Sequence, residues 1–149
     1  SLRALGCRDL FWRVLMRPGR PAFCGMLGDR PVFGLPGNAV SCMVTFWILA
    51  APALRAMAGD PTPIPAPRQA TLLARITKKR GLSVYTRARV SWEGGRLAAM
   101  PTTGQMSHQV FGQRGANALV VTPVDREAIE AGETVSIIPF AAAGWTDDL

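Results

Sequence analysis

The sequence is poor in the residues that build disulfide scaffolds and metal centres. It has three cysteines (Cys7, Cys24 and Cys42) and one histidine in 149 residues, and no two cysteines have a Cys-x-x-Cys spacing. An odd number of cysteines without such a spacing argues against a disulfide framework and against a zinc site. We therefore expect free, buried cysteines and a reducing, cytoplasmic location.

Long apolar runs are also missing. The longest, residues 39–51, has 13 residues and is interrupted by Ser41 and Thr45. A helix that spans a bilayer needs about 20 residues, so we expect a buried helix here and no membrane partner. The first residues show no basic segment followed by an apolar run, and we expect no signal peptide.

Acidic residues are nearly absent from the middle of the chain. Residues 68–114 hold nine lysines and arginines against one acid, Glu93, whereas residues 125–149 hold six acids against Arg126. The formal net charge is +7, and basic segments of this kind indicate a surface that faces an anion. No carboxylate pair is placed for acid–base catalysis or for magnesium, so we expect no metal site among these residues.

A proline-rich stretch, residues 61–67, divides the chain. Proline fixes φ and removes a hydrogen-bond donor, so we expect an extended linker. Residues 1–60 predict a strand over 11–16, a hairpin turning at Gly28-Asp29, and a helix from about Asn38 to Ala50. This helix is apolar on nearly every face and needs partners all round. We expect those partners upstream in the native protein or on another subunit.

Residues 68–149 predict a small all-β domain. Residues 84–92 alternate in the way that is typical of a half-buried strand, and Gly94-Gly95 marks a tight turn. Further strands are expected over 70–76, 96–100, 118–122 and 134–140, with a short helix over 107–113. Five or six short strands of this kind favour a small sandwich or barrel.

Three arginines form the first candidate site. Pro18 and Pro21 stiffen the segment around Arg17 and Arg20, and a guanidinium presents donors suited to phosphate and other oxyanions. Arg13 and Arg17 are four residues apart and share a face if the strand continues. We expect Arg13, Arg17 and Arg20 to bind an anion, although solvated cations beside a sheet edge would give the same pattern.

A turn between a strand and the helix is the second candidate. Asn38 is the expected N-cap after a Pro-Gly turn, and helix N-terminal amides bind anions. We place Pro36, Gly37, Asn38 and Ser41 in the site. The helix dipole contributes only about 0.3–1 kcal/mol, so neighbouring arginines have to supply most of the binding. An ordinary strand-to-helix turn is the alternative, and the ending of a Walker loop is absent.

The β-rich part supplies the third candidate, Arg87 on a strand with Gln105 and Ser107 downstream. Ser107 and His108 are adjacent in sequence and do not face each other as nucleophile and base, and no Gly-x-Ser-x-Gly elbow is present. We expect Ser107 to cap the short helix or to donate a hydrogen bond to a ligand. Catalytic residues remain unassigned.

Taken in order, these segments resemble the MoeA-type molybdopterin molybdotransferases, whose pattern also occurs in the E domain of gephyrin. The likeness extends over about residues 5–140 and is carried by Phe11-Trp12-Arg13, Arg17-Pro18-Gly19-Arg20-Pro21, Gly34-Leu35-Pro36-Gly37-Asn38, Lys78-Lys79, Arg87 and Gln105-x-Ser107-His108.

The resemblance implies the C-terminal part of an enzyme that inserts molybdate into adenylylated molybdopterin with Mg²⁺ and releases AMP. It implies that the full-length protein is a homodimer. Residues 1–60 would end a MogA-like α/β domain, 61–67 would be the linker, and 68–149 would form a β-barrel domain. It also implies that the catalytic carboxylates and the Mg²⁺ ligands lie upstream, so this chain alone is expected to be inactive.

Some positions depart from the family pattern. Arginine replaces the usual lysine at 13, 17 and 20, which keeps the charge but changes the reach. Ala39 replaces a second proline, and Met106 replaces a glycine before Ser107. Two other functions stay open, a non-catalytic scaffold and a basic β-barrel that binds nucleic acid. Because most aromatic residues lie in apolar runs and not on a stacking surface, we expect no nucleic-acid partner.

Overall fold

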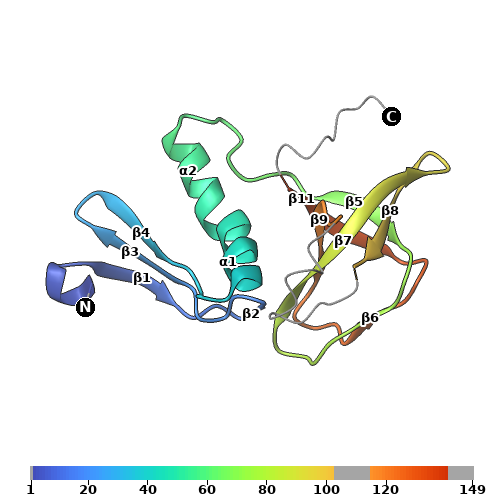
Figure 1. The fold of residues 1–149 in the computed structure, drawn as a ribbon, viewed down its shortest axis with the longest axis horizontal. Helices are drawn as coiled ribbons and strands as arrows, with labels where there is room; N and C mark the ends of the chain where they lie inside the picture. Colours follow the sequence, from blue (N-terminus) through green and yellow to red (C-terminus); the bar gives the residue numbers. More distant parts are fainter. Residues whose placement is uncertain (1, 103–114, 141–149) are drawn as a thin grey trace.

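The computed structural model describes residues 2–102 and 115–140, which form two lobes joined by one extended connection (Figure 1). The first lobe contains, in chain order, η1 (Leu2–Leu5), β1 (Arg8–Trp12), β2 (Met16–Arg17), β3 (Phe23–Leu27), β4 (Arg30–Gly34), α1 (Ala39–Thr45), η2 (Phe46–Ala50) and α2 (Ala51–Met57). The second lobe contains β5 (Arg68–Leu72), β6 (Ile76–Thr77), β7 (Ser83–Glu93), β8 (Arg96–Pro101), β9 (Ala118–Thr122), β10 (Ala128–Ile129) and β11 (Thr134–Pro139). The predicted α/β part followed by a β-barrel is confirmed.

The first lobe is built on an antiparallel sheet with the order β1-β3-β4. Its β3–β4 hairpin turns between Leu27 and Arg30, which are register partners. Gly28 has a φ of +62°, a conformation that glycine adopts readily and other residues adopt at a cost. The hairpin predicted from Gly28-Asp29 is therefore confirmed.

The continuous strand predicted over residues 11–16 is wrong. Strand β1 ends at Trp12, the last residue paired with β3, and Arg13 takes a φ of +64°. The chain becomes a strand again only at β2, where Met16 pairs in parallel with Ser83 of the other lobe. Arg13 and Arg17 thus belong to different elements and do not share the face of one strand.

The helix begins after Asn38, as predicted. The Oδ1 atom of Asn38 accepts hydrogen bonds from the amides of Val40 (3.1 Å) and Ser41 (3.3 Å). The π-helical turn η2 ends at Ala50, two residues before Pro52, which lies in the first turn of α2. In a regular α-helix the proline ring clashes with the carbonyl four residues back, and the wider turn relieves that clash.

Part of this helix packs against the barrel of the same chain. The run Ala39–Met57 has 19 residues and is long and apolar enough to cross a membrane, so the prediction of a helix too short to span is wrong. The helix is nevertheless packed on the barrel, with Val44 against Leu119 and Trp47 stacked on Phe140 at 5.8 Å. The expectation that the packing partners of this helix lie outside the chain is thus wrong for Val44 and Trp47. Other apolar side chains, Leu54 and Met57 among them, stay exposed.

The second lobe is a barrel of five strands. The sheet order is β2-β7-β8-β5-β11-β9, and β9 pairs back to β7, which closes β7, β8, β5, β11 and β9 on themselves. Closure removes free strand edges. Short strands β6 and β10 form a separate ribbon at one end of the barrel (Figure 1). The interior is filled by small and branched side chains: Ala70, Leu72, Ile76, Ala88, Val90, Leu97, Ala99, Ala118, Val120, Ile129, Val135 and Ile137.

Candidate anion-binding cavity between the lobes

A cavity of about 540 Å³ is lined by residues from both lobes. The first lobe contributes the segment from Met16 to Pro21 and, from α1, Ser41. The barrel lobe contributes residues 75–78 around β6, Leu82, and residues 84–86 of β7. Four of the lining residues are cations, Arg17 and Arg20 from the first lobe and Arg75 and Lys78 from the second.

The loop that carries Arg17 and Arg20, called the arginine loop below, is held in place by close contact with α1. Gly19 has a φ of +104°, and a Cβ atom at this position would lie 2.2 Å from Cγ2 of Thr45. Thr45 itself is fully buried. Backbone hydrogen bonds from Val14 N to Arg20 O (2.9 Å) and from Ala22 N to Gly19 O (3.0 Å) close the loop. The backbone that carries Arg17 and Arg20 is thereby fixed beside the barrel, while their side chains are exposed.

Two cations on the barrel side of the cavity are not among the site residues predicted from the sequence. The Nζ of Lys78 donates to the carbonyl of Val124 at 3.3 Å, and the Nε of Arg75 pairs with Oε1 of Glu130 at 2.9 Å. The resemblance included Lys78 only as part of a motif, and it did not include Arg75. The excess of cations over residues 68–114 was the signal, but only the fold shows which of them line the same cavity as Arg17 and Arg20.

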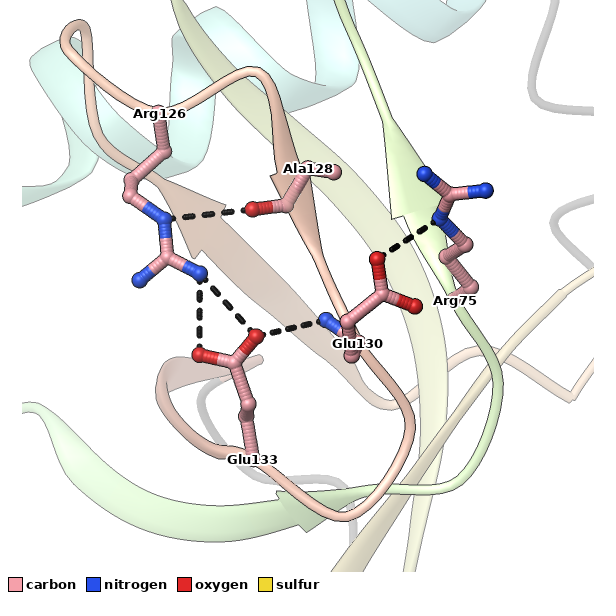
Figure 2. Close-up of polar contacts among 5 residues, drawn as sticks. All are labelled: Arg75, Arg126, Ala128, Glu130 and Glu133. Atoms are coloured by element: carbon pink, nitrogen blue, oxygen red, sulfur yellow. Dashed lines mark hydrogen bonds and ion pairs between the residues drawn. The ribbon is translucent and has the colours of Figure 1, made fainter.

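A network of polar contacts fixes the turn that holds Glu130 (Figure 2). Arg126 donates from Nη2 to both carboxylate oxygens of Glu133 (3.0 and 2.9 Å) and from Nε to the carbonyl of Ala128 (3.1 Å). Glu133 Oε1 accepts from the backbone amide of Glu130 at 2.7 Å. This amide and then Arg126 lower the pKa of Glu133 from its ordinary value.

Arg13, which was predicted to bind the anion together with Arg17 and Arg20, lies elsewhere. Its guanidinium lies 4.5 Å from the ring centroid of Trp12, in the geometry of a cation–π contact. It does not line the cavity, whereas Arg17 and Arg20 do. The structure therefore brings together two of the three predicted arginines.

Arg87 is buried and not exposed toward the cavity. Only 1% of its surface is accessible, and burial lowers the pKa of its guanidinium. It is the register partner of Leu119, which packs against the helix of the first lobe. Tyr85, two residues earlier on the same strand, does line the cavity. Burial raises the pKa of the Tyr85 hydroxyl, so this group keeps its proton at neutral pH.

The Pro36–Asn38 turn contributes little to the cavity directly. Among the four residues predicted there, Ser41 lines it, and Pro36, Gly37 and Asn38 do not. The side chain of Asn38 already accepts hydrogen bonds from the first helical amides, on Val40 and Ser41. Those two donors are satisfied by the cap. Gln105 and Ser107 lie outside the described residues.

The described residues contain no group of three or more His, Cys, Asp or Glu side chains that could hold a metal ion. Cys7, Cys24 and Cys42 are free thiols. Burial, and then the neighbouring Cys7, raise the pKa of Cys24, which keeps it protonated and unreactive at neutral pH.

Comparison with known families agrees with this division into two lobes. Residues 2–56 match the family described as a probable molybdopterin binding domain, and residues 69–140 match the MoeA C-terminal region (domain IV). The chain thus joins part of an α/β domain of the first family to a small β-barrel of the second. It belongs to the MoeA-type proteins, as the order of its sequence motifs predicts.

Two curated relatives show the extent of the similarity. Molybdopterin molybdenumtransferase 2 of Mycobacterium tuberculosis is 32% identical over 127 residues, which is 85% of this chain and 31% of the relative. Molybdopterin molybdenumtransferase of Bacillus subtilis is 31% identical over 134 residues, 90% of this chain and 31% of the relative. The chain therefore spans about a third of the length of these relatives.

Solved structures share the fold. The molybdopterin biosynthesis MoeA protein from Pyrococcus horikoshii superposes with a TM-score of 0.70 at 26% identity, covering 89% of this chain and 32% of that one. A molybdenum cofactor biosynthesis protein from Pyrococcus furiosus gives a TM-score of 0.69 at 26% identity, covering 89% of this chain and 45% of that one.

Proposed function

We propose that this chain forms the anion-binding part of a molybdopterin molybdotransferase, which inserts molybdate into adenylylated molybdopterin and releases AMP. The observation that carries the proposal is one cavity lined by cations of both lobes, Arg17 and Arg20 from the first and Arg75 and Lys78 from the second. The names of the relatives, molybdopterin molybdenumtransferases of two bacteria, support the reaction class.

The size and the charge of the cavity suit these substrates. Its volume of about 540 Å³ is within the range of roughly 300–1,000 Å³ that is usual for small-molecule sites, and it exceeds what one oxyanion needs. Molybdate is a dianion, and adenylylated molybdopterin carries a diphosphate. Arginine binds such oxygen atoms through two parallel hydrogen bonds.

In this proposal the cations hold the reactants and stabilise charge. Two anionic substrates repel each other, and the positive cavity reduces that repulsion where they meet. When water cleaves the bond between the two phosphates of adenylylated molybdopterin, a P–O bond to water forms as the bridging P–O bond breaks. AMP and the molybdopterin phosphate separate, with negative charge growing on the displaced phosphate. Guanidinium groups already directed at that phosphate stabilise this charge without reorganising.

We place the Mg²⁺ ligands and the catalytic carboxylates elsewhere in the longer protein. The described residues offer no cluster suited to a metal, and Mg²⁺ prefers carboxylate and phosphate oxygens in an octahedral arrangement. The chemistry assigned to this chain therefore goes no further than binding and charge stabilisation.

We also propose a homodimer in a cytoplasmic setting. The free thiols fit a reducing compartment, and exposed apolar residues of the first lobe, such as Leu5 and Trp12, suit a subunit or domain contact.

Calorimetric titration with AMP tests the binding part of this proposal. We expect the 149-residue protein to bind AMP but not adenosine, because the site reads phosphate. Replacing Arg17 and Arg20 together by alanine should weaken AMP binding by about tenfold or more, the effect of losing charged hydrogen bonds. Arg30→Ala, on the hairpin away from the cavity, is the matched control. Equal binding of adenosine and AMP would contradict the proposal.

A further inference from the structure

We propose that Arg75 is a further substrate-binding residue of this cavity and that Glu130 is a positioning residue that holds Arg75 in place for it. The ligand class is a phosphate ester, bound through its oxygens, and the inference depends on the proposed function. Neither residue belongs to the motifs that identified the family, and both directly flank the ribbon at the end of the barrel, Arg75 before β6 and Glu130 after β10.

The geometry leaves the binding end of Arg75 available. The shortest contact between Arg75 and Glu130 joins Nε to Oε1, at 2.9 Å. In Figure 2 the two terminal nitrogens of Arg75 point away from Glu130. Arg75 also lines the cavity. A guanidinium held by Nε still presents its terminal donors to an oxyanion.

The fold determines that these two residues meet. Ile76 of β6 pairs with Ile129 of β10 in antiparallel register, so Arg75 and Glu130 are at the next position along that ladder and face each other across it. Side chains opposite each other on such a pair are close enough to interact. Glu130 is in turn fixed by the hydrogen bond from its amide to Glu133, which Arg126 holds.

Stability alone does not account for this arrangement. The side chains of Arg75 and Glu130 are 60% and 59% exposed, and exposed ion pairs contribute little to folding. An arginine side chain has many rotamers, and ordering it when a ligand binds weakens the affinity. An ion pair that restricts Arg75 before the ligand binds removes part of that entropic cost.

The substitution Glu130→Gln separates positioning from simple charge. If Arg75 acts only through its charge, removing a nearby carboxylate makes the cavity more positive, and AMP should bind more tightly. If Glu130 positions Arg75, losing the pair frees the guanidinium, and AMP should bind more weakly. The two roles predict effects of opposite sign.

The experiment is AMP titration of the 149-residue protein and its variants by calorimetry. We expect Arg75→Ala to weaken AMP binding about tenfold, Arg75→Lys to weaken it less, and Glu130→Gln to weaken it about threefold. The control is Arg80→Ala. Arg80 is also exposed and pairs with an acid, Glu127 at 3.5 Å, but it does not line the cavity, so we expect a change of less than about twofold.

The outcomes distinguish this inference from the proposed function. If wild type binds no AMP, or if the Arg17 and Arg20 substitutions have no effect, the proposed function fails. If those substitutions weaken binding and Arg75→Ala does not, only the inference fails. Tighter AMP binding by Glu130→Gln overturns the positioning role. Thermal unfolding of each variant shows whether it has folded, and Arg75→Lys supplies the test if Arg75→Ala does not fold.

Discussion

Replacing Gly19 by alanine should destabilise the protein through two separate effects. Its φ of +104° is one that residues with a side chain rarely adopt, at a cost of about 1–3 kcal/mol. The new Cβ would also lie 2.2 Å from Cγ2 of the buried Thr45, and overpacking of this kind costs about 1–3 kcal/mol. We therefore expect a loss of about 2–6 kcal/mol in the free energy of unfolding.

Urea denaturation of a graded set of variants measures each effect. Gly37→Ala has neither problem, because no atom lies within 4 Å and its φ is ordinary, so its free energy of unfolding should change by less than about 0.5 kcal/mol. Gly94→Ala has open space but a φ of +57°, and should lose about 1–2 kcal/mol. Thr45→Ser added to Gly19→Ala removes Cγ2 but keeps the hydroxyl that donates to Ser41 O at 2.8 Å.

In the double variant, relief of the clash should recover part of the loss, while the cost of the backbone conformation remains. The reasoning is refuted if Gly19→Ala is as stable as Gly37→Ala, or if Thr45→Ser restores nothing. Either result would mean that the arginine loop does not rest on the helix, and the placement of Arg17 and Arg20 would lose its physical basis.

Three further predictions concern the turn that holds Glu130 and Glu133, the cap of helix α1, and catalysis. Because the folded state lowers the pKa of Glu133, its stabilising contribution is present above its ordinary value of 4.5 and is lost as the pH falls through the folded-state pKa. Glu133→Gln should therefore lower the melting temperature at pH 7 and have progressively less effect below about pH 4.5, and an equal difference at all pH values would contradict this. Asn38→Ala removes the acceptor for two helix amides and should cost about 1 kcal/mol in urea denaturation, whereas no change would show that the cap contributes nothing. With adenylylated molybdopterin, molybdate and Mg²⁺, the 149-residue protein should release no AMP above background, and molybdate-dependent release would show that the catalytic groups are present in it.

Local chemistry explains what the sequence predicts well. Gly28-Asp29 and Gly94-Gly95 each favour a tight turn. Short apolar runs flank the first turn and alternation over residues 84–92 precedes the second, so β3, β4 and β7 are recognisable in the sequence. Asn38 is also predictable as an N-cap residue, because its short side chain reaches the first free amides of the helix.

Non-local packing explains what the sequence does not predict. Nothing near Arg13 marks the break after Trp12, because β2 is defined by pairing with Ser83, far along the chain. Alternation along β7 assigns Arg87 to an exposed face, yet in the folded chain it is only 1% accessible. Arg75 and Glu130 meet through the pairing of β6 with β10, which no short motif encodes.

The most direct test of the account is a crystal structure of the protein with AMP bound. We predict that the phosphate lies in the cavity between the lobes, with oxygens within about 3.2 Å of guanidinium nitrogens from Arg17 or Arg20 on one side and from Arg75 on the other. A phosphate bound by cations of one lobe only, or at a site away from this cavity, would contradict the central claim that the two lobes together make the anion site.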